Sequence, residues 1–198
     1  MSQNKSHAVM QQRHEAHDSL DDFPTPPWAT RALIERVLWP EWPEFDPREA
    51  FKGYTVWEPA CNRGYMAKPL GEYFGRVVAT DIHDYGWDGQ EYSEDFLMAG
   101  GRSRPRPDWI ITNPPFRLAS QFVHKAWACQ PRWGVAMLVR SAFLEGADRY
   151  LNLFSKSPPS VVAQFVERVP MVKGRHDPAA STATSYVWLV WQMGAEGT

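Results

Sequence analysis

The feature that most constrains the fold is a repeated alternation of short apolar runs with amphipathic segments, which begins at Tyr54. The apolar runs are typical of buried strands, and the segments between them have the spacing of surface helices. Strands are predicted at residues 54–57, 76–80, 109–112, 135–139 and 161–165. Helices are predicted after the loop that contains Gly64, as far as about Phe74, and at 118–128 and 147–154. This alternation predicts an α/β fold with a doubly wound, mostly parallel sheet covered by helices on both faces. A last apolar run at residues 185–191 is expected to complete the sheet as an antiparallel C-terminal strand.

The chain has 198 residues, which is within the range of one globular domain. Residues 1–20 are polar and lack apolar periodicity, so they are predicted to be a disordered tail. The folded domain is expected to occupy residues 21–198. Its order begins near Phe23, where prolines force an extended backbone before a helix over residues 28–38. A proline-rich connection follows at residues 40–47.

Composition excludes several classes of protein. The formal net charge is −2, so any contact with nucleic acid must come from a local basic patch. Cys61 and Cys129 are too few for a disulfide framework or a zinc site. No apolar run approaches the roughly 20 residues of a membrane span. We therefore expect a soluble cytoplasmic protein that requires neither membrane nor metal.

The loop after the first predicted strand has the character of a nucleotide-binding loop. It contains Glu58-Pro59-Ala60-Cys61 and then Gly64, at the position where a doubly wound sheet normally binds its ligand. Small residues let a ligand approach the backbone closely. The loop lacks the spacing of a dinucleotide or phosphate-binding motif, which favours a ligand without phosphate. The acidic Glu58 would suit the ammonium group of a methionine moiety.

Two further carboxylates are predicted to complete this half of the site. Asp81 ends the second strand, where an acid can accept hydrogen bonds from both hydroxyls of a ribose. Asp95 can accept from an adenine amino group, and the neighbouring Phe96 can cover the ring. Their order along the chain, together with Glu58, predicts a pocket for an adenosyl group joined to an amino acid.

The most specific motif is Asn113-Pro114-Pro115-Phe116, directly after the strand at residues 109–112. The two prolines fix the backbone and hold the Asn113 side-chain oxygen and the Pro114 carbonyl outward as acceptors. A planar amine is a poor nucleophile because its lone pair is delocalised. Two acceptors on its protons favour a pyramidal nitrogen and stabilise the charge that develops in the transition state. Phe116 is expected to stack on the ring that carries this amine.

These motifs together resemble those of amino-group DNA methyltransferases of the phage and restriction-associated N6-adenine type. Phe23-Pro24-Thr25-Pro26 resembles the family's N-terminal cofactor motif, and the following motifs match in family order over residues 21–191. The resemblance implies a Rossmann-like sheet with a reversed last strand, S-adenosylmethionine as donor, DNA as partner and a flipped-out target base. It also implies a bacterial or phage-infected cytoplasm. The donor-binding residues that it implies are Phe23, Thr25, Glu58, Pro59, Ala60, Gly64, Asp81, Ile82, Asp95 and Phe96.

The sequence departs from the family pattern at two places. Asn62-Arg63 replaces the glycine-containing stretch that usually follows the first motif, although Gly64 is kept. Where the family offers an aromatic residue to sandwich the target base, this chain has Met171. Phe165, Tyr186 and Met171 itself remain alternatives for that role.

Basic residues on two segments are candidates for substrate contacts. Arg102, Arg104 and Arg106 precede the strand at residues 109–112, where a phosphate contact and ordinary solvated charge are equally good interpretations. Arg117 follows the catalytic motif, and Lys173 and Arg175 lie in a long loop before the last strand. We expect these last three to contact the substrate.

The sequence thus predicts an enzyme that methylates the N6 amine of adenine in DNA. An RNA adenine, a cytosine N4 or a protein glutamine amide presents a similar planar amine and remains an alternative. A catalytically silent nucleic-acid-binding subunit is an alternative of another class. Because the sheet uses most of the chain, either loops read a short target or a homodimer or accessory recognition subunit contributes.

Overall fold

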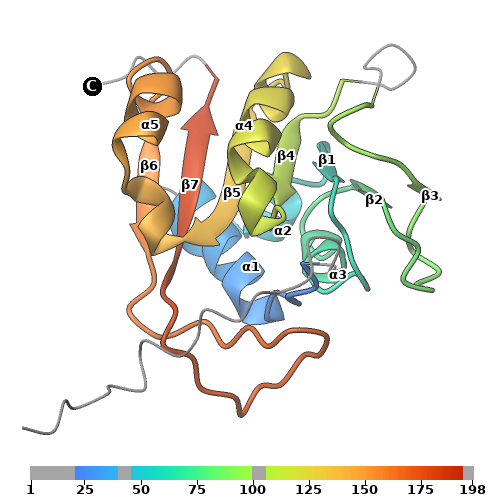
Figure 1. Cartoon of the computed structure of the whole chain (residues 1–198). Helices are drawn as coiled ribbons and strands as arrows, with labels where there is room; N and C mark the ends of the chain where they lie inside the picture. The colour runs from blue at the N-terminus through green and yellow to red at the C-terminus, as the bar shows by residue number, and fades with distance from the viewer. Residues whose placement is uncertain (1–20, 40–45, 100–105, 194–198) are drawn as a thin grey trace, which may run out of the picture.

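The computed structural model describes residues 21–39, 46–99 and 106–193, and the predicted tail at residues 1–20 lies outside them. In this part of the chain seven strands form one sheet in the order β3-β2-β1-β4-β5-β7-β6 (Figure 1). Strands β1 to β5 pair with their neighbours in parallel, and β7 is antiparallel to both β5 and β6. The bounds are β1 (Thr55–Glu58), β2 (Arg76–Asp81), β3 (Tyr92–Ser93), β4 (Trp109–Thr112), β5 (Gly134–Arg140), β6 (Val161–Gln164) and β7 (Tyr186–Gln192). The predicted fold class is confirmed, including the single reversed strand at the C-terminal end.

The reversed strand β7 lies inside the sheet, between β5 and β6. Its pairing with β5 runs from Gly134 opposite Gln192 to Arg140 opposite Tyr186. Both strands are buried along nearly their whole length, because helices cover both faces of the sheet at this position.

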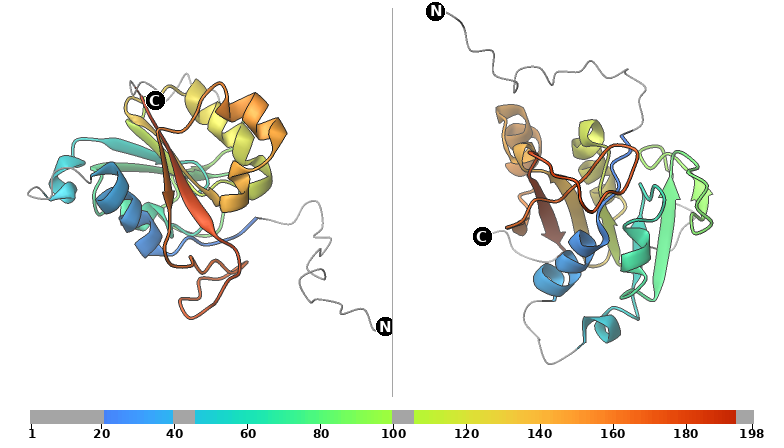
Figure 2. Two further views of the ribbon diagram at one scale, coloured as in Figure 1. Left: turned by 90° about the vertical axis from the view of Figure 1, so that its left-hand side faces the viewer. Right: turned by 90° about the horizontal axis from the view of Figure 1, so that it is seen from below.

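Helices cover each face of the sheet (Figure 2), and a large hydrophobic cluster lies on each side of it. One face carries α1 (Pro27–Leu33), its π-helical continuation η2 (Ile34–Leu38) and α3 (Ala67–Leu70). The other face carries α4 (Ala119–Ala128), α5 (Ala147–Arg149) and its continuation η5 (Tyr150–Phe154). The predicted helices at residues 28–38, 118–128 and 147–154 therefore correspond to helical structure. Short turns complete the elements: α2 (Pro47–Ala50), η3 (Phe116–Leu118) and η4 (Ser141–Leu144).

The helix expected from Gly64 to Phe74 is much shorter in the structure, because α3 has only four residues. Pro69 cannot donate a backbone hydrogen bond and Gly71 ends the helix, so turns replace the expected continuation. Strand β3 and helix α2 were not predicted. With two and four residues, neither is long enough to produce a hydrophobic period.

The parallel strands bring their carboxyl ends to one edge of the sheet. Strands β2 and β4 lie on opposite sides of β1, so the chain reverses its winding between β1 and β4. Ligands of doubly wound sheets bind at such a switch point. The segment between β6 and β7 passes across this edge (Figure 2). Within the described residues, no helix has the length and apolar character needed to span a membrane.

Candidate active site

A cavity of about 630 Å³ opens at the carboxyl edge of the sheet. Its walls come from the N-terminal segment, the loop after β1, the end of β2, the segment after β3 and the turn after β4. The lining residues are Asp21, Phe23, Pro24, Thr25, Glu58, Pro59, Ala60, Cys61, Asn62, Tyr65, Met66, Asp81, Ile82, Tyr85, Asp95, Phe96, Asn113, Pro115, Arg117, Leu118 and Phe122. The structure thus gathers most of the predicted site residues around one cavity. Gly64, Pro114, Phe116, Lys173 and Arg175 are not on its walls.

The loop after β1 accommodates its departure from the family pattern through Asn62. This residue has a φ of 50°, in the left-handed region that glycine and asparagine tolerate best. Its side-chain oxygen accepts from the backbone N–H of Arg63 at 2.6 Å, and its NH₂ group donates to Asp22 Oδ1 at 2.6 Å. Asn62 therefore supplies the turn for which the family uses glycine.

Gly64 shapes the loop from behind the cavity. Its φ is +77°, and a Cβ placed on it would meet the indole of Trp87 at 2.5 Å. The residue is therefore required for a close approach of Trp87 to the backbone. No contact of Gly64 with the cavity is present.

Glu58 lies at the end of β1 with only 1% of its surface exposed. Thr112 donates to its Oε1 at 3.4 Å, whereas Oε2 has no hydrogen-bond partner within the described part of the chain. Burial, followed by repulsion from the Asp81 carboxylate, raises the pKa of Glu58 well above its ordinary value, against the opposing effect of hydrogen bonds from Thr112 and from the backbone of Ala67. A buried carboxylate with an unpartnered oxygen on a cavity wall is suited to a cationic ligand.

Asp81 is held by the backbone at the end of β2. Its Oδ2 accepts from the N–H of Asn62 at 2.9 Å and its Oδ1 from the N–H of His83 at 3.0 Å. Burial raises the pKa of Asp81 despite these two hydrogen bonds. Each carboxylate oxygen can accept more than one hydrogen bond, so the side chain, which lines the cavity, can still accept from a pair of hydroxyls.

The predicted adenine end of the pocket has one polar and two apolar residues. Asp95 Oδ1 accepts from the N–H of Leu97 at 2.9 Å, which orients the carboxylate. Phe96 lines the cavity while packing against Trp57 and Phe122, with ring centroids 5.0 and 4.9 Å apart. Ile82 also lines the cavity and is 65% exposed, so its apolar side chain can cover a flat ring.

Asn113 has its amide orientation set by the neighbouring acceptors. Its Nδ2 donates to the carbonyl oxygen of Phe23 at 3.0 Å and contacts the sulfur of Met171 at 3.7 Å. A carbonyl can only accept, so the amide must turn its NH₂ group toward Phe23. The buried Oδ1 is left without a hydrogen-bond partner among the described residues. It is therefore a free acceptor on a residue that lines the cavity.

Phe116 is covered by other side chains. Its ring centroid lies 5.3 Å from that of Phe23 and 5.9 Å from that of Tyr186. The guanidinium carbon of Arg140 lies 4.2 Å above the Phe116 ring. The stacking face expected for a target base is thus already occupied in this structure.

The acidic pair Asp21 and Asp22 was missed at the sequence level. Asp22 is buried and pairs with Arg63 at 2.9 Å, while its backbone oxygen accepts from the N–H of Gly174 at 2.8 Å. Asp21 accepts a short hydrogen bond from the backbone N–H of Phe116. These contacts tie the N-terminal segment to both halves of the cavity. The sequence offers no local signal for them, because every partner is at least 40 residues away.

Of the predicted substrate-contacting residues, one lines the cavity and two lie in a separate loop. Arg117 is exposed on its wall. Lys173 and Arg175 are exposed in a small hairpin closed by Val172 and Arg175, and Arg175 pairs with Asp177 at 3.2 Å. This hairpin is held near the cavity by the hydrogen bond from Gly174 to Asp22.

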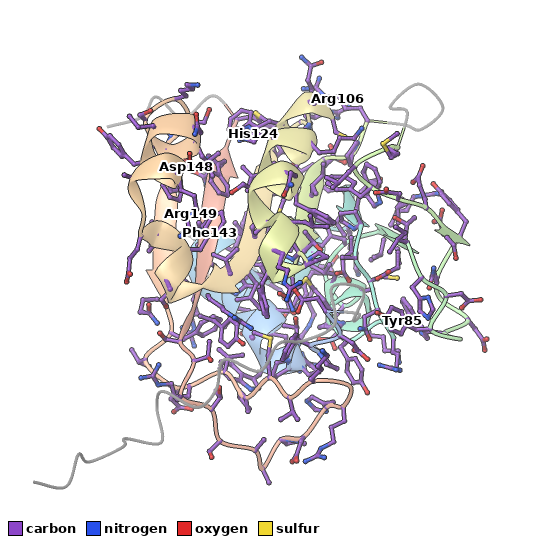
Figure 3. The ribbon with its side chains drawn as sticks, viewed as in Figure 1. Tyr85, Arg106, His124, Phe143, Asp148 and Arg149 are labelled. Carbon is purple, nitrogen blue, oxygen red and sulfur yellow. The ribbon has the colours of Figure 1, made fainter. Side chains whose placement is uncertain are left out.

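Arg106 is not among the residues that line the cavity. Its guanidinium donates to the carbonyl oxygens of Gln130 and Pro131, beyond the C-terminal end of α4. Figure 3 shows it at the top of the molecule, whereas Tyr85 of the cavity lies low on the right. Arg102 and Arg104 lie outside the described residues.

The three candidates for sandwiching a base differ in position. Met171 is buried beneath Asn113, and Phe165 packs edge-on against Trp28 at 5.4 Å. Tyr186 is the one that contacts Phe116.

The cysteines do not provide a nucleophile. Cys61 lines the cavity but is buried, and burial together with Glu58 and Asp81 raises the pKa of its thiol. Cys129 follows α4 and contributes to the core on that face. Among the described residues, no cluster of histidine, cysteine and acidic side chains has a metal-binding arrangement.

No protein-family model matches the chain, and no curated protein matches it. Several solved structures, by contrast, match its fold. The methyltransferase subunit of a type I restriction-modification system from Streptococcus thermophilus superposes with a TM-score of 0.59 at 11% identity, over 85% of this chain and 44% of that one. A candidate RNA methyltransferase from Pyrococcus horikoshii superposes with a TM-score of 0.57 at 14% identity, over 86% of each chain. The modification subunit of a candidate type I restriction enzyme from Vibrio vulnificus superposes with a TM-score of 0.55 at 16% identity. The match covers 89% of this chain and 45% of that one.

At these identities the similarity establishes a shared fold. The chain spans less than half the length of the two restriction-modification subunits. It has the α/β fold found in these methyltransferase structures, with a cavity at the carboxyl edge of its sheet.

Proposed function

We propose that this protein is an S-adenosylmethionine-dependent methyltransferase that acts on the N6 amine of adenine in DNA. One observation carries the proposal: two buried acceptor atoms without partners among the described residues, Glu58 Oε2 and Asn113 Oδ1, belong to residues that line the same cavity. Leaving such atoms unpaired costs about 1–3 kcal/mol each, more for a charged group. A ligand that donates hydrogen bonds to both would remove this cost.

The cavity residues fit the proposed donor. Glu58 would accept from its ammonium group, and Asp81 would accept from both ribose hydroxyls. Asp95 would accept from the adenine amine, with Phe96 and Ile82 against the ring. When bound, S-adenosylmethionine supplies an electrophilic methyl group on a sulfonium. The predominance of acids on this wall opposes a phosphate-bearing ligand.

Asn113 and Pro114 would hold the target amine. The Phe23 carbonyl fixes Asn113 so that Oδ1 can accept one amine proton, and the Pro114 carbonyl would accept the other. With its protons held, the nitrogen presents its lone pair to the methyl group. The fixed amide orientation requires no rearrangement at the moment of reaction.

DNA is proposed as the substrate because the Asn113-Pro114-Pro115-Phe116 motif resembles that of N6-adenine enzymes. Two of the structural neighbours are also named as restriction-modification subunits. RNA adenine is the second candidate, since the P. horikoshii neighbour is named as a candidate RNA methyltransferase and matches over most of both chains. The buried acceptors disfavour a silent subunit, which would have no use for them.

Two further parts of the proposal concern assembly. Residues 21–198 would form the methyltransferase domain. A homodimer or an accessory subunit would supply sequence recognition that the loops of this chain do not provide.

The proposal is tested by transfer of labelled methyl from S-adenosylmethionine to unmethylated duplex DNA, followed by mass spectrometry of the nucleosides. We expect N6-methyladenine from the wild type and its loss in Asn113→Ala. Asn152→Ala is the matched control, because Asn152 is exposed and its side chain donates to Asp148 of the same helical segment at 2.8 Å. Donor binding with transfer only to RNA would replace DNA by RNA, and absence of donor binding would refute the enzyme assignment.

A further inference from the structure

Among the described residues, two aromatic rings and one guanidinium group contact the Phe116 ring, and these three side chains differ in their freedom to move. Tyr186 is 2% exposed and lies in β7, in the interior of the sheet. Phe23 is held by its backbone, because its oxygen accepts from Asn113 and its N–H donates to Asp21. Arg140 is exposed at the end of β5, on a long flexible side chain. Of the three, Arg140 is the side chain that can rotate away from the ring into solvent, and in doing so it gives up its hydrogen bond with the Tyr186 hydroxyl.

The position of Arg140 resembles that of a stacked base. Its guanidinium is planar and charged, and it lies 4.2 Å from the Phe116 centroid and 5.9 Å from that of Phe23. Guanidinium groups stack on aromatic faces much as bases do. A base that stacked on this face of Phe116 would have to displace it.

We propose that Arg140 occupies the target-base position while the substrate is absent, and that it moves to a phosphate of the nucleic acid when the base enters. This inference rests on the proposed function and deepens it, because it commits the substrate to a polynucleotide. The same side chain opposes entry of an isolated base and favours binding of a strand. Removing it must therefore change these two affinities in opposite directions.

The matched control is Arg149. Its guanidinium carbon lies 5.0 Å above the ring of Phe143, so it makes the same kind of contact. Figure 3 shows this pair on the helical face formed by α5, and neither residue lines the cavity. Arg149→Ala removes a cation–π arginine without touching Phe116.

The experiment uses two probes with the full chain in the presence of S-adenosylhomocysteine. One is 2′-deoxyadenosine, titrated by ligand-observed NMR, and the other is a mixed-sequence single-stranded DNA, titrated by fluorescence anisotropy at several salt concentrations. For Arg140→Ala we expect deoxyadenosine to bind about two- to fivefold more tightly, the factor of one exposed cation–π contact. We expect DNA to bind more weakly. The salt slope, which is the slope of the logarithm of the binding constant against the logarithm of the salt concentration, should fall in magnitude by about 0.7, the value of one phosphate contact on a single strand.

Two further variants complete the test. Arg140→Lys should keep the wild-type salt slope, because it keeps the charge, and Arg149→Ala should change neither affinity. If Arg140→Ala weakens both probes alike or alters neither, the inference is wrong even though the enzyme methylates DNA. If the wild type binds no donor and transfers no methyl group to nucleic acid, the proposed function fails and the inference fails with it.

Discussion

Replacing Glu58 by glutamine should separate the stability of the protein from its capacity to bind the donor. Glu58 is buried, its Oε2 has no hydrogen-bond partner among the described residues, and the Asp81 carboxylate repels it. Glutamine has nearly the same shape and no charge. The ligand-free variant should therefore be more stable than the wild type at a pH where Glu58 is ionised.

The sign follows from the pKa of Glu58, which burial raises well above its ordinary value of 4.5. The folded state favours the protonated form, so stability contributed by Glu58 is present at low pH and is lost as pH rises through the folded pKa. Glutamine does not titrate. The free energy of unfolding of Glu58→Gln should equal that of the wild type near pH 4. The difference in favour of the variant should grow with pH to roughly 1–3 kcal/mol, the cost of an unsatisfied buried group. In a domain of this size each kcal/mol raises the Tm by about 2–4 °C.

Donor binding should change in the opposite direction. Removing one partner of a buried ion pair costs about 3 kcal/mol or more, which weakens the Kd at least about 100-fold. Thermal unfolding between pH 4 and pH 9 and calorimetry with S-adenosylmethionine measure the two effects. Glu49→Gln is the control, since Glu49 is exposed and pairs with the exposed Lys52. A Glu58→Gln protein that binds the donor normally would refute the assignment of Glu58 to the ammonium group.

Three other substitutions test the site and its scaffold. Gly64→Ala should lower the free energy of unfolding, measured by denaturant titration, by about 1–3 kcal/mol, because the φ of Gly64 is +77° and Trp87 fills the space that a Cβ would need. Gly53→Ala is the control. A Cβ at Gly53 would meet nothing within 4 Å, so this variant should be within about 0.5 kcal/mol of wild type. Cys61→Ala should retain methyl transfer in the labelled-methyl assay, because a buried thiol with a raised pKa is no nucleophile, and complete inactivation of a folded, donor-binding variant would contradict this. Asp22→Ala removes the bonds to Asn62 and Arg63 and should weaken donor binding by about tenfold in calorimetry, from one charge-assisted hydrogen bond; unchanged affinity would argue against a role for the N-terminal segment.

The positions of the principal strands along the chain, and the reversed direction of the last one, could be predicted from the sequence. Most of the cavity could also be predicted, because parallel strands put their carboxyl ends on one edge and so bring Glu58, Asp81 and Asn113 together. The short elements β3 and α2 could not be predicted. They contain too few residues for a period, and pairing and packing with distant segments determine them.

What the sequence by itself determined is which residues face the core and which chemical groups end each strand, since periodicity and strand ends are local properties. The tertiary structure decided which segments are neighbours. It placed β7 between β5 and β6, directed the Asn113 amide through the carbonyl of Phe23, and brought Arg140 over Phe116. Each of these contacts joins residues far apart in the chain. Their formation depends on how two layers of helices pack on a twisted sheet, and no local pattern records that packing.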